Sequence, residues 1–181
     1  MRKFILITST LLIVLLSGCA SKHAILNQNY ETRQVIIPGK LVGINIIDQR
    51  QEVTTEKIKL PTISFPGKVN KVSPELTSEQ EQLITNQIKS YFTNNDRALS
   101  VNCYIIEGFQ EFSAHTFYER EYVQCDVKIE LTDQSNDILK YCTSSFFVEA
   151  KSVDATYAYM NKIYEKAIRT SIYKCFEKLD D

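Results

Sequence analysis

The stretch that decides the fold is EYVQCDVKIEL, Glu121 to Leu131, where apolar and polar residues alternate from Tyr122 onward. The odd-numbered positions from 123 to 131 are Val, Cys, Val, Ile and Leu, and the even-numbered ones from 122 to 130 are Tyr, Gln, Asp, Lys and Glu. Successive side chains of a strand point to opposite faces. The alternation therefore predicts a strand with one buried face and one wet face.

Similar stretches lie on both sides of this strand. LSVNCYIIEGF (Leu99 to Phe109) precedes it, and ILKYCTSSFFVEA (Ile138 to Ala150) follows it after the turn-forming residues DQSND. Together these three stretches predict a meander of strands. A further strand is predicted upstream in KLVGINIIDQR (Lys40 to Arg50), which is rich in Val and Ile.

Two helices complete the pattern. The first follows a capping box, either Ser78 with Glu81 or Thr77 with Gln80, and ends at TNND from residue 93 to 96. The last runs from about residue 155 to residue 179, with apolar side chains at helical spacing. Its apolar stripe consists of Met160, Ile163, Tyr164, Ala167, Ile168, Ile172, Cys175, Phe176 and Leu179.

These elements predict one α+β domain over residues 35–181. We expect a single, mostly antiparallel sheet of about four strands, with two helices packed on one face. The polar positions of the strands leave the other face to water or to a partner.

The chain begins with a segment typical of export. Arg2 and Lys3 precede a thirteen-residue apolar run from Phe4 to Leu16, which small residues close. A membrane-spanning helix needs about 20 residues, and an all-apolar helix at the extreme terminus does not suit a protein core. We interpret residues 1–18 as a signal peptide.

Its end, Leu16-Ser17-Gly18-Cys19, resembles the bacterial lipobox. The resemblance implies a lipoprotein signal peptide that is cut before Cys19, with a diacylglycerol on the Cys19 thiol and an N-acyl chain such as palmitate on its amino group. The alternative is a conventional signal peptide followed by a chance cysteine. No other cofactor is expected.

The acyl chains would anchor the protein, because two or more chains make stable attachment to a membrane. Ala20 and Ser21 follow the cysteine, which in lipobox families implies the outer membrane, facing the periplasm or the cell surface. Residues 19–34 are polar without a period and are interpreted as a tether that reaches about 50 Å.

The order of the elements resembles small bacterial lipoproteins of the YajG-like and outer-membrane-assembly type. Their first strand often ends in Asp-x-Arg, as Asp48 and Arg50 do here, but the long proline-containing loop that follows departs from the pattern. Taken on their own, these two residues share a face at the strand end. A salt bridge is expected there more than a binding contact.

Charge and motifs exclude several functions. Without residues 1–18 the chain has 19 basic and 22 acidic residues, which gives no support to nucleic-acid binding. His23 lies in the tether, and His115 lies in the predicted hairpin tip FSAHTFY, where an exposed turn residue is expected. No catalytic motif and no cysteine–histidine cluster for a metal is present.

We therefore expect no enzyme. The favoured interpretation is an accessory or structural module that is anchored in the envelope through its lipid and binds another envelope protein. The alternative is a tethered enzyme or small-ligand binder that acts on the envelope.

Four cysteines remain besides Cys19, and export would place them where disulfides form. Cys103 and Cys125 both fall on inward positions of their strands, and a turn centred near Ala114 would set them opposite each other. If oxidation occurs, this pair is the predicted bridge. The alternative is four buried free thiols that behave as small hydrophobes.

The segment KIKLPTISFPGKVNKVS, Lys57 to Ser73, contains four lysines and no acid. Long irregular loops are often functional, so one interpretation is a site for an acidic protein surface or anionic headgroups. The other is an irregular edge strand folded onto the sheet, with its apolar residues in the core. The residues that would bind the partner are Ile63, Phe65, Lys68 and Lys71.

Overall fold

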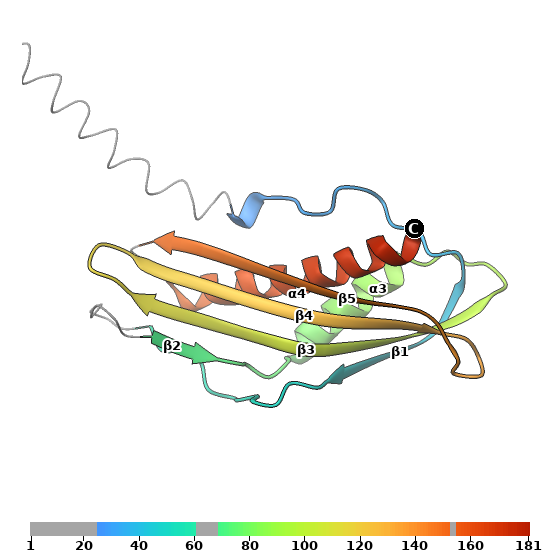
Figure 1. The fold of residues 1–181 in the computed structure, drawn as a ribbon, viewed down its shortest axis with the longest axis horizontal. Coiled ribbons are helices and arrows are strands. Elements are labelled where there is room, and N and C mark those ends of the chain that lie inside the picture. Colours follow the sequence, from blue (N-terminus) through green and yellow to red (C-terminus); the bar gives the residue numbers. More distant parts are fainter. Residues whose placement is uncertain (1–24, 61–68, 153–154) are drawn as a thin grey trace, which may run out of the picture.

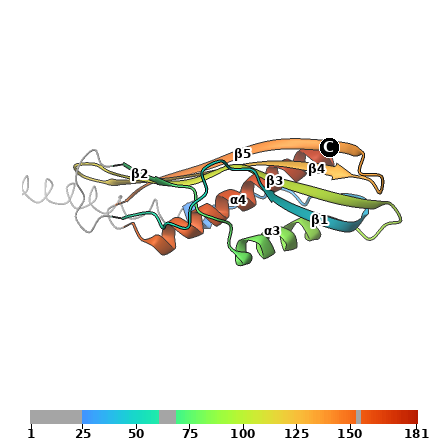
Figure 2. The ribbon, with the colours of Figure 1, turned by 90° about the horizontal axis from the view of Figure 1, so that it is seen from below.

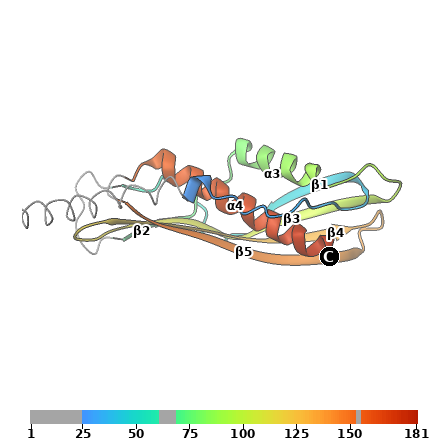
Figure 3. The ribbon, with the colours of Figure 1, turned by 90° about the horizontal axis from the view of Figure 1, so that it is seen from above.

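The computed structural model describes residues 25–60, 69–152 and 155–181. Its sheet contains β1 (Lys40–Asp48), β2 (Val69–Val72), β3 (Ala98–Ala114), β4 (Glu119–Thr132) and β5 (Ile138–Ser152), as Figure 1 shows. The helices α3 (Ser78–Ser90) and α4 (Tyr157–Asp180) lie on the same side of this sheet (Figures 2 and 3). None of the helices described is long and apolar enough to cross a membrane.

The sheet confirms the predicted class, an α+β domain with a mostly antiparallel sheet. The strand order is β1-β3-β4-β5, and β2 also pairs with β3. β2, β4 and β5 join the sheet in antiparallel fashion, but β1 runs parallel to β3, with Lys40 opposite Ala98 and Asp48 opposite Ile105. The parallel pair needs a crossover connection, and α3 supplies it.

The buried faces follow the predicted periods. On β4 the inward positions 123, 125, 127, 129 and 131 are buried, and the whole predicted stripe of α4 is buried too.

α3 begins at the second of the two capping registers. Thr77 is the N-cap, because its hydroxyl accepts from the Gln80 amide at 3.2 Å while the Gln80 side chain accepts from the Thr77 amide at 3.1 Å.

The predicted facing of Cys103 and Cys125 is wrong. β3 extends to Ala114 and its hairpin turn lies beyond that residue, so Cys103 pairs with Ile129 and Cys125 pairs with Gly108. A bulge after Ile105 shifts the register once more. Both thiols are buried and free, as are those of the other two cysteines described.

Residues 25–37 form a strap along α4, which we call the N-terminal strap. The sequence predicts a free tether up to residue 34, and this is wrong from residue 25 onward. The amides of Thr32 and Arg33 donate to the buried Tyr173 hydroxyl, each at 3.0 Å. Ile37 is buried, and its amide donates to the Tyr91 carbonyl at 2.7 Å. Residues 19–24 lie outside the described residues.

Candidate functional site

The sheet face opposite the helices carries a stack of three aromatic rings, which we call the aromatic stack. Phe109 of β3 stacks on Tyr122 of β4 with ring centroids 5.7 Å apart, and Tyr122 stacks on Phe147 of β5, also at 5.7 Å. The three residues occupy outward positions of neighbouring strands, because residues next to them in sequence, such as Gln110, Val123 and Phe146, are buried on the opposite face. Offset rings in contact form a rigid apolar surface.

Two cations lie over the aromatic stack, one over Phe109 and one over Tyr122. Lys71 of β2 places its Nζ 3.6 Å from the centroid of the Phe109 ring, and the Arg120 guanidinium lies 5.3 Å from that of Tyr122. Arg120 also pairs with Glu149 at 3.0 Å and with Glu111 at 3.5 Å. The stack is therefore bordered by fixed charges of both signs.

Exposure of the aromatic stack increases from β3 to β5. Phe109 is only 8% exposed, whereas Phe147 is 59% exposed, and Tyr141 on the same face of β5 is 70% exposed. Aromatic residues with a charged border are typical of the centre of a protein interface. Chemically, this face can bind a flat apolar surface and orient it through its charges.

Of the residues predicted for partner binding, the structure places one. Lys71 lies in β2 and covers Phe109, as described above, so the lysine belongs to the border of the aromatic stack. Ile63, Phe65 and Lys68 lie outside the described residues. Residues 69–72 pair with β3 as β2, as the edge-strand alternative expects. The two residues that this alternative places in the core, Ile63 and Phe65, are not among those described.

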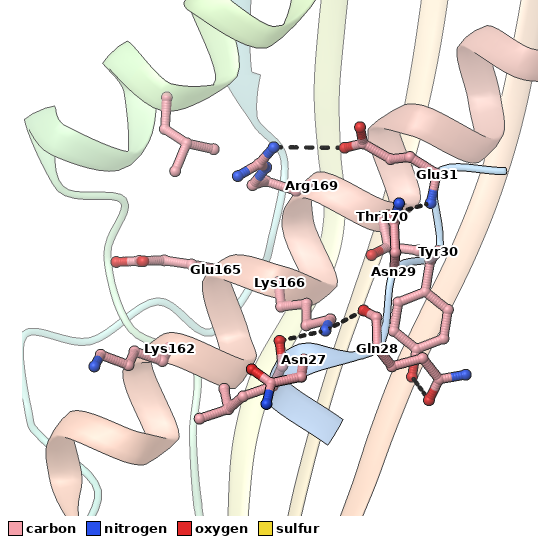
Figure 4. A pocket seen from close by; sticks show the side chains of 12 residues that line it. Asn27, Gln28, Asn29, Tyr30, Glu31, Lys162, Glu165, Lys166, Arg169 and Thr170 are labelled. Carbon is pink, nitrogen blue, oxygen red and sulfur yellow. Dashed lines mark hydrogen bonds and ion pairs between the residues drawn. The ribbon is translucent and has the colours of Figure 1, made fainter. Parts of the chain in front are cut away.

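A pocket of about 390 Å³ lies on the other side of the domain, between the strap, α3 and α4. Figure 4 shows Lys166 of α4 pointing at the strap, where its Nζ donates to the carbonyls of Ile25 at 2.6 Å, Leu26 at 2.8 Å and Gln28. Tyr30 covers the same ammonium with its ring centroid 5.1 Å away. Burial lowers the pKa of Lys166.

The rest of the pocket is charged but more open. Arg169 reaches Glu31 of the strap at 3.5 Å, and Lys162 and Glu165 complete the α4 wall (Figure 4). Lys166 fills its donor capacity with main-chain carbonyls, so it fastens the strap and does not serve a ligand. A small anion would be attracted by Lys162 and by Arg169, although Arg169 already pairs with Glu31.

Asp48 and Arg50 form the predicted salt bridge, which confirms the structural interpretation of this pair. The Arg50 side chain is 2% exposed and donates to both carboxylate oxygens of Asp48. Burial acts to raise the pKa of Asp48, but the hydrogen bonds and charge of Arg50 outweigh it and hold the pKa below its usual value. The remaining Arg50 donors bind the Pro74 carbonyl at 2.8 Å and the Tyr164 hydroxyl at 3.0 Å.

His115 lies in the turn between β3 and β4, as predicted. Its ring stacks on Tyr118 with centroids 4.6 Å apart, and its Nε2 lies 3.2 Å from the Ser113 hydroxyl. Phe117 at the tip of the same turn is 88% exposed. Across the residues that the structure describes, no three side chains of His, Cys, Asp or Glu gather closely enough to hold a metal ion.

Comparison with known proteins finds only distant similarity to solved structures. No family model and no curated protein matches the sequence. Among solved structures, the chain is similar to a Xanthomonas campestris protein described under the family DUF330, with a TM-score of 0.45 and 9% identity over 79% of this chain and 84% of that one. It is also similar to a minor lipoprotein from Acinetobacter baumannii, with a TM-score of 0.36 and 11% identity over 78% and 90%. Both scores lie below 0.5, so neither similarity identifies a function.

Proposed function

We propose that this chain is an envelope lipoprotein, anchored through acyl chains on Cys19, whose domain is an accessory module that binds another envelope protein through the uncovered face of its sheet. The observation that carries the binding role is the aromatic stack. Its outer ring, Phe147, is exposed on the same face as Tyr141, and apolar residues exposed on one face of a monomeric protein often serve an interface. The anchoring role rests on the lipobox-like sequence.

The partner that fits this face is a protein with an apolar patch and charges of both signs at its edge. Phe147 and Tyr141 would supply the buried centre of the interface, since exposed aromatic residues carry much of the energy of protein association. Lys71 and Arg120 would lie at the border of the interface. Charges there contribute to the orientation of the partner more than to the affinity.

The N-terminal strap would set the distance between this module and the membrane. Lys166 fixes the chain from Ile25 onward, so only the residues between Cys19 and Ile25 can span the gap. Their full reach is about 20 Å, far less than the about 50 Å that a free tether would allow. The bound partner would therefore also lie close to the membrane. Outer-membrane attachment facing the periplasm is part of this proposal.

The test is site-specific photo-crosslinking in cells. A photoreactive phenylalanine analogue replaces Phe147 in the full chain, and matched chains carry it at Phe117, which is more exposed but lies at the hairpin tip, or at Lys162 on the helix side. We expect one discrete protein adduct from position 147, absent from the other two positions and weakened by Lys71→Glu. Equal adducts from all three positions, or none from position 147, would contradict the binding face.

The pocket beneath the strap favours the second candidate, a binder of a small anion. In that case native mass spectrometry of the purified protein should show a bound small molecule that Lys162→Met removes and Phe147→Ala retains.

A further inference from the structure

Cys142 and Cys175 meet between the two layers of the domain. Cys142 lies on the helix-facing side of β5, where it is 7% exposed and pairs with Ile129 of β4. Cys175 lies on the buried stripe of α4 and is fully enclosed. Both thiols are free in the structure.

The alignment of β5 with α4 brings the two residues to the same level. The Lys140 ammonium donates to the Leu179 carbonyl at 2.8 Å, and the two elements run in opposite directions (Figure 1). Going from Lys140 to Cys142 advances about 6.6 Å along the strand. Going back from Leu179 to Cys175 covers about 6 Å along the helix. The two steps match, so Cys175 lies over Cys142.

A second contact and the chemistry of the thiols agree with this alignment. The Lys178 ammonium lies 3.4 Å from the Thr143 carbonyl, next to the cysteine pair. Burial raises the pKa of Cys175, and a hydrogen bond with the Cys142 side chain raises it further. The two thiols therefore lie near each other between β5 and α4.

The other two cysteines are poor competitors. Cys103 pairs with Ile129 on the far side of β4 from Cys142, which puts two strand spacings, about 9.6 Å, between them. Cys125 is displaced by four residues from the position opposite Cys103, about 13 Å along the strand. A disulfide needs Cα atoms within about 7 Å.

We propose that Cys142 and Cys175 are the thiols that oxidise to a disulfide, joining β5 to the last turns of α4. This rests on the proposed envelope location, since that compartment supplies the oxidant, a disulfide-donating protein of the thiol oxidase class. By thiol–disulfide exchange the two cysteines lose two protons and two electrons and form one S–S bond, and the donor disulfide is reduced to two thiols. Because both sulfurs end up buried, the exchange precedes final packing of α4 on the sheet.

The bond would secure the part of α4 that holds the strap. Tyr173 and Arg33 meet within the same turns, since the Tyr173 hydroxyl accepts from the Arg33 amide. A disulfide that closes the chain between residues 142 and 175 restricts the unfolded state. The strap would then dock on a helix end that is covalently fixed to the sheet.

The test maps disulfides in the full chain. Protein purified in reductant is unfolded in denaturant and refolded in a glutathione redox buffer, so that exchange can precede packing. It is then alkylated under denaturing conditions and digested without reduction, with Cys19 followed through its own peptide. We expect a linked Cys142–Cys175 peptide and two free thiols among the four cysteines of the domain. Cys103→Ala and Cys125→Ala should keep this peptide. Four free thiols, or a linked peptide that contains Cys103 or Cys125, would overturn the proposal.

A second experiment distinguishes the pairing of Cys142 with Cys175 from the proposed envelope location of the protein. The same mapping is applied to protein from the envelope fraction of cells. A linked Cys142–Cys175 peptide in both arms supports pairing and export together. A peptide that forms in glutathione but not in cells leaves the pairing supported and contradicts the envelope location of the proposed function.

Discussion

The Arg50 guanidinium on the segment after β1 donates a hydrogen bond to the Tyr164 hydroxyl on α4, 3.0 Å away. The same guanidinium binds the Pro74 carbonyl, the Gly108 carbonyl and the Asp48 carboxylate. One buried cation thereby joins the end of β1, the segment after β2, the bulged region of β3 and the helix layer. Its donors face acceptors from four parts of the chain, so it serves the fold and not a ligand.

Replacing Arg50 should be strongly destabilising. Arg50→Met leaves Asp48 and the main-chain carbonyls without their donors, and removing one partner of a buried pair costs about 3–5 kcal/mol. Urea unfolding measures the change in the free energy of unfolding. The control is Arg97→Met, which removes an exposed arginine and should change that free energy by about 0.5 kcal/mol or less. Equal losses from both variants would contradict the role of Arg50.

The Asp48 carboxyl should make stability depend on acid pH. Its pKa is lowered in the folded protein, so its ionised form stabilises the fold above the ordinary aspartate pKa of about 3.9. This contribution is lost as the pH falls through the lowered pKa. The free energy of unfolding of Asp48→Asn should therefore be lower than that of the unmodified protein at pH 6, and the difference should shrink below about pH 4.

The control for this pH dependence is Asp96→Asn, which removes an exposed carboxyl before β3. Unfolding curves of the three proteins are compared between pH 6 and the acid range. A difference between Asp48→Asn and the unmodified protein that stays constant across this range would show that the carboxyl does not titrate with folding.

Gly108 and Tyr164 should be coupled. A Cβ atom at position 108 would collide with the Tyr164 hydroxyl, so Gly108→Ala should cost roughly 1–3 kcal/mol through overpacking. Tyr164→Phe removes that hydroxyl and costs about 1 kcal/mol for its hydrogen bond. In the double variant the collision is absent. Its loss of unfolding free energy should therefore be smaller than the sum of the losses in the two single variants. Strict additivity in urea unfolding would exclude the collision.

Lys166 should hold the N-terminal strap on α4. Lys166→Met removes three hydrogen bonds from an ammonium to main-chain carbonyls, and we expect the free energy of unfolding to fall by about 1–3 kcal/mol. Limited proteolysis should cut the strap near Ile25 faster than in the unmodified protein.

Lys162→Met is the matched control for the strap, because Lys162 lies one turn earlier on α4 and lines the same pocket but is exposed. It should leave the cleavage rate unchanged. A strap that is cut equally fast in both variants would show that Lys166 does not fasten it.

Local periodicity was sufficient to predict much of the fold. The alternation around Val127 and the stripe through Ile168 predict buried faces that the structure confirms, because each pattern reports on its own element. The parallel pairing of β1 with β3 and the bulge after Ile105 were not predicted. They depend on which edges meet in space, and no local pattern carries that information.

The site was less predictable for the same reason. Outward positions for Tyr122 and Phe147 follow from alternation, but their stacking requires the register between β4 and β5, which alternation alone does not give. Most residues of the strap up to residue 34 are polar and lack a period, which is typical of a tether. One residue that holds the strap, Lys166, lies 141 residues from Ile25 in sequence. This lysine binds main-chain carbonyls, which any sequence would present.

The central claim, that a lipid on Cys19 anchors this module, is tested most directly by mass spectrometry of the amino-terminal peptide from protein extracted from cell membranes. The account predicts that the mature chain begins at Cys19, with a diacylglycerol thioether on its sulfur and an acyl chain on its amino group. Cys19→Ala should yield unprocessed or unanchored protein. A mature chain that begins elsewhere, or one with an unmodified Cys19, would contradict the account.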